Sequence, residues 1–159
     1  MVEYNPKVMQ HFLKPKNVGK IEKPDGIGKV GNMSCGDIMY VYIKIKETKG
    51  KEVIDKIKFQ TLGCAAAIAT SDVVIELAKG KTIQEALKIT NKDVVDELGG
   101  LTYIKVHCSL LAEEALWEAI YDYLKRNGKL IPKELQERHK KTLIAEKNFH
   151  DKFKCGDKK

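Results

Sequence analysis

Two alternating segments joined by a short polar turn constrain the fold of this chain most. In residues 38–46 the apolar side chains of Val41, Ile43 and Ile45 alternate with polar or aromatic ones, and in residues 53–62 Ile57 and Phe59 do the same. Alternation with a period of two predicts β-strands that have one buried and one wet face. The turn at residues 47–51 is short, so we predict an antiparallel hairpin.

Helical patterns surround this hairpin. Asn5 and Pro6 predict the start of an N-terminal helix over residues 4–13. An Ala-rich helix follows over 65–78, and its Ala66, Ala69, Val73 and Leu77 form one packing face. Two short capped helices (83–89 and 91–98), a long helix (107–127) and a polar helix (132–149) complete the chain. With a further short strand at 27–30, this order predicts an α+β domain with helices on one sheet face.

Length and charge narrow the class of protein. The chain has 159 residues, 43% of them apolar, which fits one soluble globular domain. Its formal net charge is +7, but the lysines are spread along the chain without an RNP-type or zinc-finger spacing. We interpret this charge as a solvated basic surface and tail, with docking onto an acidic protein surface as a second use. We do not expect a nucleic-acid partner, but a basic nucleic-acid-binding module stays as a rival interpretation, which steeply salt-dependent binding to DNA or RNA would favour.

Hydropathy predicts no membrane segment. No run approaches the roughly 20 apolar residues that span a bilayer. The N-terminal residues are charged and lack the apolar core of a secretion signal. We therefore expect a cytoplasmic protein, in which thiols stay reduced and cysteines are candidates for metal, redox or catalytic roles.

Three cysteines lie where the chain changes its structure. Cys35 precedes the first clear strand, and Cys64 lies at the turn from the second strand into the Ala-rich helix. Cys108 lies where an apolar, strand-like run at residues 104–106 gives way to the longest helix. The gaps between them are too long for a zinc knuckle, but such chain ends can gather at one edge of a sheet. Helix N-termini there would favour thiolates.

Two further side chains can complete a metal site. Asp37 offers an oxygen ligand, and His107 offers a nitrogen ligand or a base for Cys108. Three sulfurs with one such donor suit tetrahedral zinc, or iron in a cluster. The alternatives are that the cysteines are core residues, that Asp37 caps a turn and that His107 is solvated. Cys155, in the basic tail, is interpreted as an exposed bystander thiol.

Read together, the motifs resemble one family. Residues 31–39 (GNMSCGDIM), 61–71 (TLGCAAAIATS) and 105–113 (KVHCSLLAE) are similar to the three cysteine motifs of the IscU/NifU-type iron–sulfur cluster assembly scaffolds. Tyr4, Asn5 and residues 11–19 (HFLKPKNVG) are also similar. The resemblance covers about residues 3–128.

This resemblance implies a fold and a function. The fold is a three-stranded antiparallel sheet with helices packed on one face. The function is that of a scaffold and not an enzyme: a cysteine desulfurase of the IscS/NifS type passes persulfide sulfur chiefly to Cys108, and iron joins. A [2Fe–2S] cluster then forms on Cys35, Cys64 and Cys108, with Asp37 or His107 completing the ligands. The cluster passes to recipient apoproteins or carrier proteins.

The resemblance also leaves options open. Zinc can occupy the same site, and a SufU-like zinc-dependent sulfurtransferase is the alternative function, although the insert typical of that branch is not seen between Cys64 and Cys108. Dimers or trimers occur in the family, so a homo-oligomer is one option. Residues 101–105 (LTYIK) replace the Leu-Pro-Pro-Val-Lys chaperone-docking motif of bacterial members, and Lys105 is a further candidate site residue. We assign residues 1–130 to the scaffold domain and 131–159 to a C-terminal helical extension with a basic tail.

Overall fold

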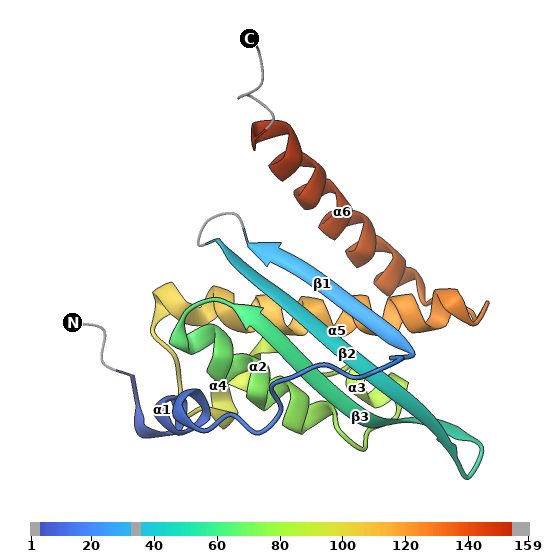
Figure 1. The fold of residues 1–159 in the computed structure, drawn as a ribbon, viewed down its shortest axis with the longest axis horizontal. Helices are drawn as coiled ribbons and strands as arrows, with labels where there is room; N and C mark the ends of the chain where they lie inside the picture. The colour runs from blue at the N-terminus through green and yellow to red at the C-terminus, as the bar shows by residue number, and fades with distance from the viewer. Residues whose placement is uncertain (1–3, 33–35, 154–159) are drawn as a thin grey trace.

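A three-stranded antiparallel sheet forms the centre of the molecule. The computed structural model describes residues 4–32 and 36–153. The strands lie in the order β1 (Gly26–Asn32), β2 (Asp37–Thr48) and β3 (Lys51–Leu62). Helices α2 (Ala65–Ala78) and α5 (Val106–Arg126) pack on the same face of this sheet (Figure 1). The predicted α+β fold with a hairpin and helices on one face is confirmed.

The remaining helices begin at the caps that the sequence indicates. Helix α1 (Pro6–Leu13) begins where the Asn5 side chain accepts a hydrogen bond from the Val8 N–H. Thr82 and Thr90 form capping boxes at the starts of α3 (Ile83–Ala86) and α4 (Asn91–Glu97). A side-chain oxygen at each cap satisfies a backbone N–H that has no partner within the helix.

The core lies between the sheet and the two helices. Val41 pairs with Phe59, and both are buried on the inner face. Burying a side chain of this size contributes about 1.5–3 kcal/mol to the free energy of unfolding. Strand β1 packs closely on α5: a Cβ at Gly28 would lie 1.9 Å from the Ala115 carbonyl oxygen. Gly28 therefore allows β1 to lie directly against α5, and the strand is longer than the predicted 27–30.

Two local predictions need correction. Residues Tyr103–Lys105 form a 3-10 helix that runs directly into α5, so the run at 104–106 is not strand-like. Such a short apolar run cannot distinguish a strand from a first helical turn. Helix α2 is buried on more than the one predicted face, because β3, α1 and α5 all contact it. Ala67, Val74 and Ile75 are buried there as well.

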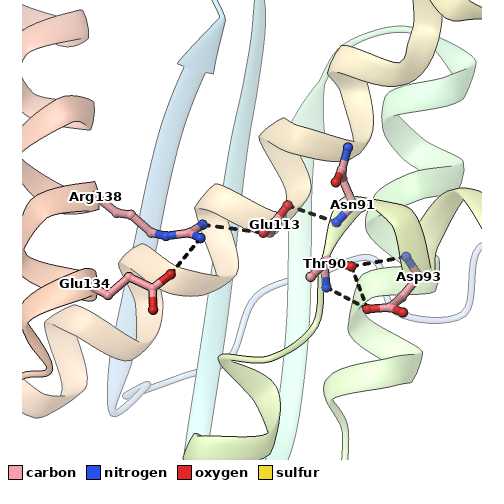
Figure 2. Close-up of polar contacts among 6 residues, drawn as sticks. All are labelled: Thr90, Asn91, Asp93, Glu113, Glu134 and Arg138. Carbon is pink, nitrogen blue, oxygen red and sulfur yellow. Dashed lines mark hydrogen bonds and ion pairs between the residues drawn. The ribbon is translucent and has the colours of Figure 1, made fainter.

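Helix α6 (Lys133–Phe153) extends past the β1 edge of the sheet (Figure 1). It contacts α5 through Arg138, whose guanidinium lies over the Trp117 ring. Figure 2 shows Arg138 between Glu134 of its own helix and Glu113 of α5. The other carboxylate oxygen of Glu113 accepts a hydrogen bond from the Asn91 N–H at the start of α4. Within the described residues, every helix is too short or too polar to cross a lipid bilayer.

Candidate metal centre

Three donor side chains meet at one end of the sheet. Asp37 is the first residue of β2, Cys64 is the N-cap of α2, and Cys108 lies in the first turn of α5. One carboxylate oxygen and the two sulfur atoms all lie within 4.8 Å of one another. The fold therefore brings together donors that are 27 and 44 residues apart in the sequence.

The spacing of the two thiols suits a single metal ion. The Sγ atoms of Cys64 and Cys108 are 3.6 Å apart. This separation is well beyond the roughly 2.05 Å of a disulfide bond. Two thiolates bound about 2.3 Å from one tetrahedral metal would lie about 3.8 Å apart. The observed distance is close to that value.

Both cysteines lie at helix N-termini. Cys64 caps α2 by position, but its side chain makes no capping hydrogen bond. Its sulfur therefore makes no hydrogen bond to the first turn of α2 that a metal ion would have to displace. The backbone N–H groups of a first helical turn lack partners and carry a partial positive charge, which favours a thiolate or an anionic ligand. Cys108 is 1% exposed, whereas Cys64 is half-buried and so accessible from the surface.

Asp37 carries a buried acceptor atom that has no hydrogen-bond donor in the part of the chain that the structure describes. This atom is Oδ2, and the side chain is 6% exposed. A buried polar atom left unpaired costs about 1–3 kcal/mol, so such an atom calls for a ligand. Gly36 precedes Asp37 with φ of +73°, a conformation that glycine adopts without strain. These features fit an oxygen donor held ready for a metal ion or a cluster.

Two basic side chains border the thiols. The Nε2 atom of His107 lies 3.6 Å from the Cys108 Sγ, so His107 can exchange a proton with that thiol or replace Asp37 as a ligand. The charge of the Cys64 thiolate is the main cause that raises the pKa of Lys105, with smaller contributions from Tyr4 and Cys108. A cation at this position favours the thiolate form of the site.

Two cysteines singled out from the sequence lie outside the described residues. These are Cys35, in the connection between β1 and β2, and Cys155, in the C-terminal tail. Of the other candidate ligands, Asp37, Cys64 and Cys108 come together, and His107 lies beside Cys108. Their role as ligands stays a prediction, as does that of Cys35.

The structure adds two residues that pattern analysis missed. Tyr4 packs against Cys108 and the first turn of α2, beside the candidate site. Asp72, fully buried in α2, accepts hydrogen bonds from the N–H groups of Lys16 and Asn17 and from the Asn17 side chain. Its second oxygen lies 2.8 Å from His11 Nδ1. The sequence signal for this role of Asp72 was the presence of a carboxylate in the middle of an Ala-rich helix.

Asp72 explains the N-terminal motif in physical terms. The segment with His11, Lys16 and Asn17 lies on α2, where the Asp72 carboxylate bonds to all three residues. His11, Asp72 and Glu76 also lie within 4.8 Å of one another. Because Asp72 already accepts several hydrogen bonds, we interpret this group as a structural lock and not as a second metal site.

Comparisons with known proteins agree with this geometry. Residues 3–130 match the family model described as the NifU-like N terminal domain. The chain is 58% identical over 127 residues to the iron–sulfur cluster assembly scaffold protein IscU 1 of Archaeoglobus fulgidus, covering 80% of each chain. It is 48% identical over 128 residues to IscU of Aquifex aeolicus, again covering 80% of each.

A solved structure is similar as well. It is a protein from Fervidobacterium islandicum described as a candidate scaffold for iron–sulfur cluster assembly in the SUF system. The TM-score is 0.62 at 28% identity, and the match covers 74% of this chain and 96% of that one. The N-terminal part of a NifU-like protein from Brucella abortus, at 19% identity and a TM-score of 0.60, shares the fold.

Proposed function

This chain belongs to the NifU-like N-terminal domain family of iron–sulfur cluster assembly scaffolds, and we propose that it assembles a [2Fe–2S] cluster and then transfers it. The cluster is cargo that is built and released, not a resident cofactor. The observation that carries the proposal is the convergence of Asp37, Cys64 and Cys108, with one buried carboxylate oxygen unpaired and the two sulfurs 3.6 Å apart.

Four ligands are needed for the cluster, two on each iron. We assign Cys35, Cys64 and Cys108 to three of these positions and Asp37 or His107 to the fourth. Cys35 lies two residues before Asp37 in the sequence, which is the reason for including it with the other ligands. A carboxylate or imidazole ligand protonates or swings away more readily than a thiolate, which suits a cluster that must leave.

Sulfur enters by thiol exchange. The Cys108 thiolate attacks the outer sulfur of a persulfide on a cysteine desulfurase, and a new S–S bond forms on Cys108 while the old S–S bond breaks. The desulfurase cysteine leaves as a thiolate. Reduction of the transferred sulfur to sulfide takes two electrons, which an external reductant must supply. His107 and the N-terminus of α5 favour the attacking thiolate.

Three further assignments belong to this proposal. The partners are a cysteine desulfurase and recipient iron–sulfur apoproteins or carriers, in the cytoplasm. Residues 1–130 form the scaffold domain, and 131–159 form the extension with α6.

Zinc bound to the same donors, without cluster formation, would instead favour the zinc-dependent sulfurtransferase, for which the tetrahedral spacing of the thiols is equally suitable.

Anaerobic reconstitution tests the function. The chain is incubated with a cysteine desulfurase, cysteine, ferrous iron and dithiothreitol as reductant, and the absorption spectrum is followed. We expect the chromophore of a [2Fe–2S] cluster, and we expect Cys35→Ser, Cys64→Ser and Cys108→Ser each to impair it. Absence of the chromophore, or indifference to all three substitutions, would overturn the proposal. Tight zinc binding with stimulated desulfurase turnover and no chromophore would identify the alternative.

Two variants refine the assignment of ligands. Asp37→Ala is expected to slow the loss of the cluster, because a labile ligand is removed. Cys155→Ser serves as the control thiol and should leave cluster formation intact; impaired formation would add Cys155 to the ligands. Spectroscopy of the cluster in His107→Ala then distinguishes between oxygen and nitrogen as the fourth donor.

A further inference from the structure

The outer face of the sheet, opposite α2 and α5, carries a basic surface that the proposed function does not use. We define this outer face by Lys29, Tyr40, Tyr42, Lys56, Lys58 and Leu62. Register places these residues on one side: Tyr40 pairs with Lys29, and Tyr42 pairs with Lys58. Their sequence neighbours Met39, Val41 and Phe59 point to the core and are at most 1% exposed. The six side chains therefore face away from the helices.

The lysines of the outer face are largely uncompensated. Asp25 and Asp55 are paired with Lys44 and Lys46, 3.0 Å away in each case. Among the described residues, no carboxylate forms an ion pair with Lys29, Lys56 or Lys58. The Lys58 ammonium donates to the Lys16 carbonyl but keeps its charge. An unneutralised group of positive charges attracts an acidic partner and speeds its approach.

The aromatic residues of this face favour a protein over a nucleic acid. The Tyr40 and Tyr42 rings are stacked on each other, with centroids 6.4 Å apart. Lys29 lies over the Tyr40 ring, and the Tyr42 hydroxyl donates to Gln60. Tyr42 is only 8% exposed and Lys29 lies over one face of the half-buried Tyr40, so neither ring offers an open platform on which bases could stack. They form instead a rigid, half-buried floor between the lysines.

The outer face ends at the candidate metal centre. Leu62, the last residue of β3, is 72% exposed and lies two residues before Cys64. Its partner across the strands is Ile38, which follows Asp37. A protein bound on this face would therefore meet basic side chains along the sheet and an exposed apolar side chain beside the thiols.

We propose that the outer face is the docking surface for an acidic protein that receives the cluster. This inference rests on the proposed function for the identity of the cargo. Charge complementarity with Lys29, Lys56 and Lys58 guides the partner, and Leu62 gives an apolar contact next to the site. The paired rows from Ile38 to Lys44 span only about 20 Å by 15 Å, at about 3.3 Å per residue and 4.8 Å between strands. A face of this size suits a short-lived complex, as transfer requires.

Binding of the cluster-free chain to an acidic protein provides the first test. The probe is a fluorescently labelled plant-type apo-ferredoxin, an acidic protein with four cluster-binding cysteines. Binding is measured by anisotropy at about 0.01 M salt, where the Debye length is about 30 Å, and again at higher salt. The variant Lys29→Glu/Lys56→Glu/Lys58→Glu should raise Kd by about tenfold or more at low salt. The difference should shrink as salt is added.

A matched variant controls for net charge. Lys133→Glu/Lys140→Glu/Lys147→Glu reverses the same number of exposed charges on α6, away from the sheet. It should leave Kd within about twofold of the unsubstituted chain. Equal weakening by both variants, or no binding by the unsubstituted chain, would overturn the proposal. So would tighter binding of a single-stranded 20-nucleotide RNA probe that depends on the same three lysines.

Transfer of the cluster is the second test. From the reconstituted chain, the outer-face variant should transfer its cluster to the apo-ferredoxin about tenfold more slowly, while cluster formation and lifetime without an acceptor stay unchanged. Unchanged transfer would overturn the inference and leave the proposed function standing. If reconstitution itself fails, the proposed function falls, and the binding test on the cluster-free chain still decides whether the surface docks an acidic protein.

Discussion

Gly63 lies against the carboxylate of Asp37, so closely that a Cβ at this position would be 3.0 Å from the Asp37 Cγ. The same Cβ would also be 3.0 Å from the Cβ of Ala67. Gly63 thus lets β3 and the start of α2 close around the buried carboxylate. Residue 63 in the second cysteine motif is therefore a glycine for a steric reason: a larger side chain would collide with the Asp37 carboxylate of the candidate site.

Gly63→Ala is therefore expected to displace Asp37. Overpacking of this kind costs about 1–3 kcal/mol in the free energy of unfolding, measured by urea denaturation. Cluster lifetime should shift in the same direction as in Asp37→Ala. Gly50→Ala is the control, because a methyl group there meets open space and only the backbone, at φ +72°, is strained. A site that responds equally to both substitutions would argue against a specific contact between Gly63 and Asp37.

Asp72 should contribute strongly to stability. Asp72→Ala leaves the buried N–H of Asn17 and the partly buried N–H of Lys16 unpaired, and it is expected to lower the free energy of unfolding by about 3 kcal/mol. Asp72→Asn keeps an acceptor oxygen and should lose less. Asp96→Ala, which removes an exposed ion pair with Lys92, should change the free energy of unfolding by less than about 0.5 kcal/mol. Similar losses in Asp72→Ala and Asp96→Ala would contradict the lock.

Glu113 predicts a pH dependence of stability. Burial raises the pKa of its carboxyl above the ordinary 4.5, and the Asn91 N–H and Arg138 only partly offset this (Figure 2). The folded chain therefore binds the proton more tightly than the unfolded chain. The contribution of Glu113 to stability is full below about pH 4.5 and falls as pH rises through the folded pKa. Urea denaturation across this range should give a flatter pH dependence for Glu113→Gln.

An exposed glutamate provides the comparison for that experiment. Glu137→Gln alters a solvated carboxyl of α6 and should leave the pH dependence close to that of the unsubstituted chain. If Glu113→Gln and Glu137→Gln give the same slope, burial of Glu113 does not govern the titration. The Gln side chain at 113 can still accept the Asn91 N–H, so the substitution removes the charge and keeps the shape.

Arg138 should hold α6 on the body of the protein. Its guanidinium covers Trp117, which is the single tryptophan of the chain, so tryptophan emission reports on the surroundings of this one ring. Arg138→Ala is expected to shift the emission to longer wavelength and to lower the free energy of unfolding by about 1–2 kcal/mol. Arg126→Ala, at an exposed pair with Asp122, should leave the spectrum unchanged. An unshifted spectrum in Arg138→Ala would show that α6 stays docked without this residue.

Local patterns predicted most of the fold. The strands of the hairpin, the Ala-rich helix and the caps at Asn5 and Thr82 follow from side chains within a few residues of each other, so sequence alone was sufficient. For α4 the sequence allowed Thr90 or Asn91 as the cap, and the structure has Thr90. The sequence did not show why residue 28 is a glycine, because the reason lies in α5, far along the chain. The lock at Asp72 likewise joins residues that are 55 to 61 positions apart.

The candidate site was predictable in its members but not in its geometry. Cys64 and Cys108 could be selected because each precedes or begins a helix, and Asp37 because it lies beside a cysteine. The sequence could not give the 3.6 Å between the sulfurs or the unpaired carboxylate oxygen, which depend on how α2 and α5 pack on the sheet. The 3-10 helix before Cys108 was not predicted, because a segment of three residues is too short to show a hydrophobic period.

The origin of the donors in three separate elements has a thermodynamic consequence. Asp37, Cys64 and Cys108 come from β2, α2 and α5, and a cargo bound to all of them ties these elements together. A ligand present at a hundred times its Kd adds about 2.7 kcal/mol to the folded state. Loading should therefore raise the melting temperature, and handover should return the scaffold to a looser state. The melting temperature of the chain would therefore report whether the cargo is bound.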